Sequence, residues 1–336
     1  MATSLIVLAM LLWAGPARAQ DEIGQQPGPE VHETLVAPPV ASAAELVELA
    51  RTRLEGGDYQ GARIALDQAL GRGEVDVDLV VYLRGVSWEL EGDPAQAIRL
   101  YDEGMRQWPI SPLHRDRSFR KAEALGTLGV PKEGLEWLHR IDARELEPLD
   151  RHKYELVEGI LTVQAGRTRK GLRILRDALH EVTTKELTFY QAKARATIAR
   201  VLADQAAELT FDKGEKKLVK RLQKRATLID GIEKQVTEAA ELDEPEWVLE
   251  GLLTLGDAYQ AFGDDLAVHR RPRKLTPEQL EVYEEGVLGK VETVWVKAMR
   301  SYDLGLDMAT RIGWKSRRVE QLRDARERAV ARIEGL

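Results

Sequence analysis

The segment GDPAQAIRLYDEG at residues 92–104 decides the fold, because the chain repeats its pattern. The segment GDYQGARIALDQA at residues 57–69 precedes it by 35 residues, and weaker copies begin at Gly129 and Gly166, each 37 residues after the previous one. In every copy a small residue follows the glycine by five positions and a large residue by nine. Glycine permits a turn, while the small residue lets two antiparallel helices approach closely. The pattern therefore predicts a stack of helix hairpins.

These spacings, with Pro109 at the end of the second copy, resemble the tetratricopeptide repeat (TPR). The resemblance implies an all-α, right-handed superhelical solenoid of antiparallel helix hairpins. Four TPR-like repeats are expected over residues 43–182.

A further copy near the C-terminus is interrupted. LGDAY at residues 255–259 matches a first TPR helix, and Gly263 falls where the turn is expected. The segment that matches the second helix, AMRSYDLG at residues 298–305, lies about thirty residues farther along the chain than in the other copies. This places an insertion of that length near 264–295. Thr276, the proline after it and Gln279 give the cap of a helix that is expected to run from Pro277 to Ile312 and to end at Gly313.

A second long helix is predicted between residues 213 and 243, with an antiparallel mate near 188–209. Its apolar stripe has heptad-like spacing and consists of Leu218, Leu222, Ile229, Ile232, Val236 and Ala240. The N-terminal half of the helix at 277–312 should project beyond the solenoid body or pack on this neighbouring long helix. Two long second helices side by side would give residues 183–313 a coiled-coil-like character, as two long-helix TPR-like hairpins. Residues 314–336 are expected to form a C-terminal capping helix.

The N-terminus has the features of a secretory signal. Residues 5–14 are an apolar run too short to span a bilayer, and Ala17 and Ala19 form an A-x-A cleavage site. We therefore expect a signal peptide at residues 1–19 and a flexible Pro-rich linker at 20–42, although no Lys or Arg precedes the apolar run. The alternative is a buried N-terminal helix. Export predicts a periplasmic protein with no transmembrane span after cleavage, with peripheral membrane association left open.

Composition and motifs argue against catalysis. The chain of 336 residues has no cysteine, which excludes disulfides, thiolate nucleophiles and Cys-ligated metals. A net charge of −7 gives no reason to expect nucleic acid as a partner. P-loop, G-x-S-x-G, H-E-x-x-H and G-x-G-x-x-G motifs are absent, and the six histidines show no i, i+4 pair. We expect no enzyme activity, no cofactor and no metal.

Basic residues gather in two stretches of this acidic chain. The predicted patch consists of Lys213, Lys217, Lys220, Arg221, Lys224, Arg270, Arg271 and Arg273. Anionic lipid, anionic glycan or an acidic protein could dock there. The alternative is an ordinary solvated helix face.

The TPR resemblance also implies which first-helix positions line a groove on the inner face of the solenoid. They are Val47, Arg51, Tyr82, Val86, Phe119, Glu123, Leu156 and Ile160. Because most are apolar, the groove would suit an amphipathic helix or an extended hydrophobic segment. The alternative is that the chain fills the groove itself.

Two functions remain open. One is a non-catalytic scaffold or adaptor that binds other proteins of a bacterial envelope assembly. The other is an accessory or regulatory subunit of a cell-wall or envelope enzyme complex. Over residues 250–320, LGDAY, then PxxLTPEQ and then a long helix before Trp314 also resemble TPR proteins of bacterial gliding-motility envelope machinery.

Overall fold

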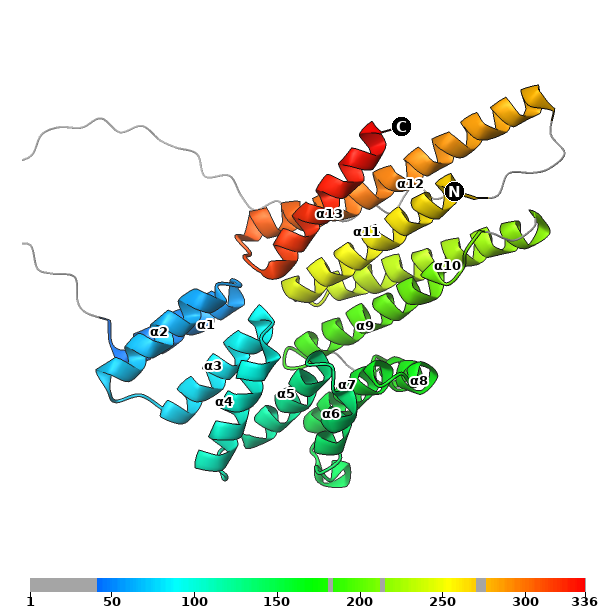
Figure 1. The fold of residues 1–336 in the computed structure, drawn as a ribbon. Coiled ribbons are helices and arrows are strands. Elements are labelled where there is room, and N and C mark those ends of the chain that lie inside the picture. Colours follow the sequence, from blue (N-terminus) through cyan, green and yellow to red (C-terminus); the bar gives the residue numbers. More distant parts are fainter. Residues whose placement is uncertain (1–40, 181–183, 212–214, 270–275, 336) are drawn as a thin grey trace, which may run out of the picture. The chain divides into compact units, whose positions relative to one another are not determined.

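The computed structural model describes residues 41–180, 184–211, 215–269 and 276–335. Within these ranges the chain is all-α, as predicted, with thirteen α-helices, one short 3-10 turn and no strand (Figure 1). The predicted signal peptide and almost all of the predicted linker lie outside the described residues.

The helices form consecutive hairpins, and the hairpins of the C-terminal half are the longer ones. They are α1 (Ala43–Glu55) with α2 (Tyr59–Arg72), α3 (Val77–Glu91) with α4 (Pro94–Gln107), α5 (His114–Thr127) with α6 (Pro131–Leu138), α7 (Pro148–Gln164) with α8 (Thr168–Ala178), α9 (Thr188–Ala207) with α10 (Glu215–Ala240), and α11 (Pro245–Ala267) with α12 (Pro277–Ile312). The helix α13 (Arg317–Glu334) follows the last hairpin, and the 3-10 turn η2 (Ala143–Glu145) precedes α7.

The local signals at the ends of α12 set its bounds. The Thr276 hydroxyl accepts a hydrogen bond from the Gln279 backbone N–H at 3.3 Å, and the Gln279 side chain accepts one from the Thr276 N–H at 3.0 Å. Gly313 ends the helix with φ of 69°, a left-handed conformation that glycine adopts without strain. The predicted helix from Pro277 to Ile312 is therefore confirmed.

Each helix packs against its hairpin partner, and the hairpins stack in sequence order. Helices α5, α7, α9, α11 and α13 also contact one another in turn, and we call this series the first-helix row. The predicted mate of α10 is confirmed as α9. The predicted pairing of the two long second helices is wrong. In the described ranges α10 packs on α9 and α11 while α12 packs on α11 and α13, so that α11 lies against both long helices.

The turn predicted at Gly263 is also wrong, because α11 continues as a helix to Ala267. A Cβ atom at Gly263 would lie 2.5 Å from Cδ1 of the Trp295 ring. Glycine is required here for the close approach of α12 and not for a turn. The additional residues therefore lengthen both helices of this hairpin.

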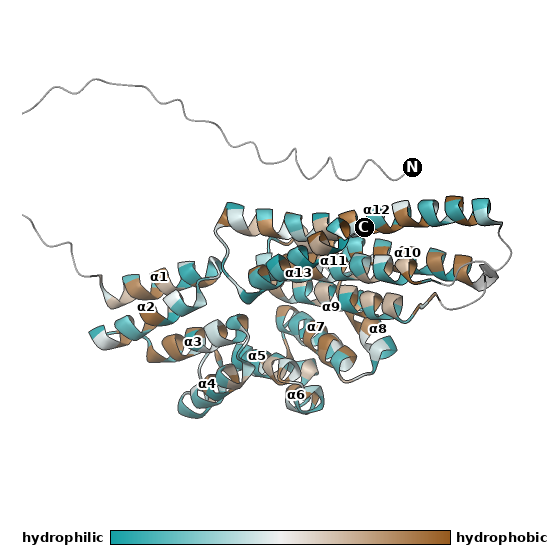
Figure 2. Ribbon diagram, turned by 45° about the horizontal axis from the view of Figure 1, so that its top comes forward, coloured by the Kyte–Doolittle hydropathy of each residue, from teal (hydrophilic) through white to brown (hydrophobic). Residues whose placement is uncertain are grey.

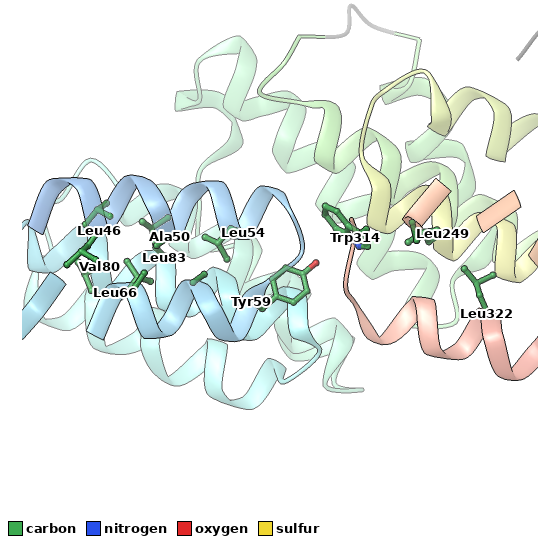
Figure 3. Close-up of a cluster of buried hydrophobic side chains, with 14 of the residues drawn as sticks. Leu46, Ala50, Leu54, Tyr59, Leu66, Val80, Leu83, Leu249, Trp314 and Leu322 are labelled. Atoms are coloured by element: carbon green, nitrogen blue, oxygen red, sulfur yellow. The ribbon is translucent and has the colours of Figure 1, made fainter. Parts of the chain in front are cut away.

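One buried cluster joins the first hairpin to the last helices. Trp314, in the turn between α12 and α13, lies between Tyr59 of α2 and Leu249 of α11 (Figure 3). Its indole N–H donates a hydrogen bond to Glu246 at 3.1 Å, and its ring lies against the backbone at Gly57. Residues near the two ends of the described chain thus share one core.

The long helices are amphipathic. Hydrophilic and hydrophobic residues alternate along α10, α11 and α12 (Figure 2). In the part of the chain that the structure describes, no helix is both long and apolar enough to cross a membrane.

Candidate binding site on the first-helix row

The structure buries six of the eight residues predicted to line an open groove. They are Val47, Val86, Phe119, Glu123, Leu156 and Ile160. Tyr82 and Arg51 are half-buried. Their burial supports the alternative interpretation, in which the chain itself fills this face, and these side chains offer little surface to a partner.

Aromatic residues from later helices pack in the same cluster as Phe119, Leu156 and Ile160. Phe189 and Tyr190 begin α9, and the Phe189 ring packs edge-on against Trp247 of α11 with centroids 5.7 Å apart. The Arg120 guanidinium of α5 lies 5.1 Å from the centre of the Phe189 ring, a cation–π contact. Sequence reasoning missed these covering residues, since no repeat motif contains them.

Beneath the aromatic rings lies a network of charged side chains. Tyr82 donates a hydrogen bond to Asp116, and Arg120 Nε donates to Tyr82 Oη at 3.1 Å and to Asp116 Oδ2 at 3.3 Å. Arg120 also pairs with Glu89 at 3.3 Å. Burial alone would raise the pKa of Asp116, but Arg120 and the Tyr82 hydroxyl hold that pKa below its usual value. Burial raises the pKa of Tyr82, which keeps it a neutral donor.

Glu123 belongs to the same internal network. Glu123 is 1% exposed, and its carboxylate lies 3.1 Å from Lys193 Nζ of α9. Burial raises the pKa of Glu123, an effect that the Lys193 ammonium opposes. Lys193 Nζ also lies 5.2 Å from the centre of the Trp247 ring. This predicted groove residue therefore holds α5 and α9 together.

Farther along the first-helix row, the structure leaves a cavity of about 380 Å³. Five alanines of α9 and α11 contribute to its wall, and α10 and α13 complete it. The polar lining residues are Arg200, Asp204, Arg225, Glu250, Thr254, Asp257, Arg318 and Gln321. Its volume is in the range of ligand-binding cavities, and side chains from four helices converge on it.

An Arg–Glu–Arg cluster borders the cavity. Glu250, which is 3% exposed, pairs with Arg318 Nη1 at 2.6 Å and also with Arg200. Arg318 Nε lies 3.5 Å from Glu246. Desolvation lowers the pKa of Arg200, and the nearby Arg318 lowers that pKa further. Two guanidinium groups thus crowd one buried carboxylate.

The two arginines differ in accessibility. The Arg200 side chain is 60% exposed, whereas that of Arg318 is 27% exposed. Arg200 can turn from Glu250 toward an anionic group in the cavity, and Glu250 then keeps Arg318 as its partner. A buried carboxylate left without a partner would oppose such a movement, and this arrangement avoids that cost.

Carboxylates stand on another side of the cavity. Asp257 accepts a hydrogen bond from the Tyr302 hydroxyl at 2.8 Å, and burial raises the pKa of Asp257. Asp204 is exposed. Sequence reasoning missed this site, although Glu246, Glu250 and Asp257 interrupt the apolar pattern of α11 at helical spacing and could have indicated a polar contact within the stack.

The predicted basic patch is only partly described. Lys220 and Lys224 are exposed on α10, while Arg221 donates a hydrogen bond to the Thr210 carbonyl oxygen at 2.5 Å. The backbone of Lys217 lies in α10, and its side chain is outside the described residues. Lys213, Arg270, Arg271 and Arg273 also lie outside them.

Among the described residues no group of His, Asp and Glu is arranged to hold a metal ion. No protein-family model matches the chain, and no curated protein matches its sequence.

Proposed function

We propose that this chain is a non-catalytic scaffold of a bacterial envelope assembly, built as a right-handed TPR-like solenoid, and that it binds an acidic segment of a partner protein. The repeated hairpin motif supports the TPR assignment, and the apolar run and A-x-A site of residues 1–19 support export. The partner contacts the cavity between α9, α11 and α13.

The observation that carries this proposal is the arrangement of Arg200, Glu250 and Arg318. The accessible Arg200 supplies the cation for an incoming carboxylate, and the Arg318–Glu250 pair at 2.6 Å stays in place behind it. Charge-assisted hydrogen bonds of this kind are about twice as strong as neutral ones. The alanine surface of the cavity leaves room for a segment of partner chain.

Site-specific photocrosslinking in the producing cells tests this function. A photoreactive residue at Ala207, an exposed residue of the cavity wall, should form an adduct with a partner protein. The photoreactive residue placed instead at position 64, where Ile64 lies on the exposed side of α2, should not form that adduct.

The second step of the experiment removes the cation. Arg200→Ala in the Ala207 background should abolish the adduct without changing the thermal unfolding curve, because Glu250 retains Arg318. Arg169→Ala on α8 removes another exposed arginine and should leave the adduct intact. An adduct that survives Arg200→Ala, or none at Ala207, would contradict binding at the cavity.

A further inference from the structure

The N-terminal part of α12 extends past the end of α11, the helix it packs on. Trp295 of α12 packs near the end of α11, over Gly263, and α11 stops at Ala267. From residue 277 to residue 290 no side chain of α12 is buried. We call residues 277–290 the α12 arm, and Figure 1 shows it extending past the end of α11. At 1.5 Å per residue it is about 20 Å long.

One side of the arm is acidic. Exposed residues recur there at alternating spacings of three and four, which places them on one helical face that continues one turn beyond the arm. This acidic face consists of Glu278, Glu281, Glu285, Leu288 and Glu292. Residues 277–289 contain no Lys or Arg that could neutralise it along the helix. Within the described ranges, Glu281, Glu285 and Glu292 take part in no ion pair.

The acidic face is separate from the side of α12 that continues its core stripe. On that core side, Tyr283 contacts His269, which follows the end of α11. Leu288 is 46% exposed and lies within the acidic face. In a pair of packed helices, apolar side chains bury against the partner while charged residues beside them form interhelical pairs.

A complementary surface lies on the first half of α10. Residues 218–225 contain four cations and no acidic residue. Lys220 and Lys224 are exposed and lie four residues apart, so they point to the same side of the helix, and we call this pair the basic face. In the described part of the chain neither lysine forms an ion pair. Unlike Arg225, which is buried beside Phe211, both lysines are available to a partner.

The acidic and basic faces lie at the same end of the helix stack, and their helices begin there. Figures 1 and 2 both show the starts of α10 and α12 extending in the same direction. The two helices do not pack along each other in the described ranges. A second copy related by a two-fold axis at this end would place its basic face on the acidic face of the first copy, and the reverse contact would form at the same time.

We propose that the chain forms a two-fold dimer in which the acidic face of α12 in each copy packs antiparallel against the basic face of α10 in the other. Opposite charges select this pairing, and Leu288 loses contact with water in it. The contact goes beyond the proposed binding function, because the cavity beside Arg200 takes no part in it.

A charge-swap experiment tests the dimer on the full secreted chain. Variant one carries Glu281→Lys and Glu285→Lys, and variant two carries Lys220→Glu and Lys224→Glu. Sedimentation equilibrium at low salt should show two chains for the unchanged protein and one chain for each variant alone, because like charges then face each other at both contacts. An equimolar mixture of the two variants should recover the dimer, since both contacts become complementary again.

Several outcomes would overturn the proposal. One is that the unchanged protein stays monomeric at low salt. The same holds if the monomer binds vesicles containing phosphatidylglycerol through its basic face. Another is a mixture that stays monomeric although both variants keep their helical circular dichroism, which would place the charge pairing within one chain or with another protein. Glu327→Lys with Asp324→Lys on α13 is the matched control, and this variant should remain dimeric.

Discussion

Asp116 shows how one side chain can be decisive in a repeat protein. It accepts hydrogen bonds from Tyr82 and Arg120, and Lys153 Nζ lies 3.6 Å from its other oxygen. These residues come from α3, α5 and α7, so this carboxylate ties three consecutive hairpins together. Nothing in the repeat motif marks the position, because the motif records helix packing and not the charges between helices.

We expect Asp116→Asn to lower the free energy of unfolding by about 2 kcal/mol at pH 7, since hydrogen bonds to a charged group are lost. The pKa of Asp116 is depressed in the folded chain, so its contribution is complete above the unfolded value of about 4 and is lost as the pH falls through the lower folded value. The difference between the two proteins should therefore shrink below about pH 4. Urea denaturation across this pH range measures it.

Asp67→Asn is the control for this prediction. Asp67 pairs with Arg84 at 3.5 Å on the surface, and its side chain is 57% exposed. Such a pair contributes little, so the substitution should change stability by less than about 0.5 kcal/mol at any pH. Equal losses from Asp67→Asn and Asp116→Asn would show that the network between the hairpins has no special role.

At the scale of single helices, two glycines of the α11–α12 hairpin have different surroundings. Gly263 of α11 lies under the Trp295 ring, whereas Gly286 of α12 has open space where a Cβ atom would lie. The Trp295 ring is itself buried and donates a hydrogen bond to Asp264 at 3.0 Å, so it has little freedom to shift. The same substitution should therefore have opposite effects at the two positions.

We expect Gly263→Ala to destabilise the chain by about 1 kcal/mol, because overpacking against a fixed ring outweighs the gain in helix propensity. Gly286→Ala should raise the helical signal and stabilise the arm by up to about 1 kcal/mol. Circular dichroism at 222 nm during thermal unfolding measures both effects. A stabilising Gly263→Ala would mean that Trp295 is free to move away.

The limits of α12 could be predicted from the sequence because they depend on neighbouring residues. The cap at Thr276 and the stop at Gly313 are local, and the predicted α12 is confirmed at both ends. The accessibility of the inner face could not be predicted in this way. Phe119 is buried in one cluster with Tyr190, and Phe189 packs against that cluster from about 70 residues later in the chain, so no local spacing reports the contact.

The same limit applies to the candidate binding site. Arg200, Glu250 and Arg318 lie on three different helices, and their meeting depends on how successive hairpins stack. The sequence does contain one usable signal, the acidic residues within the apolar pattern of α11. A buried carboxylate needs a cation nearby, but periodicity alone does not say which arginine supplies it.

At the scale of the whole described unit, the first hairpin belongs to the same buried cluster as α11, α12 and α13. Repeat proteins usually have contacts only between neighbouring repeats, so their terminal hairpins fray first. Here Tyr59 lies beside Trp314, far along the chain (Figure 3). This long-range contact should protect the first hairpin against local unfolding.

We therefore expect Trp314→Ala to lower the free energy of unfolding by about 3 kcal/mol. It should also accelerate amide hydrogen exchange in α1 and α2 more than in α6 and α8, because the first hairpin loses its contact with the last helices while the middle hairpins keep theirs. Exchange followed by mass spectrometry distinguishes this from a uniform loss of stability. Trp137→Ala on α6 removes a similar ring that contacts Lys121 at 3.5 Å, and it should leave exchange in α1 and α2 unchanged. Uniform acceleration by Trp314→Ala would mean that the unit unfolds only as a whole.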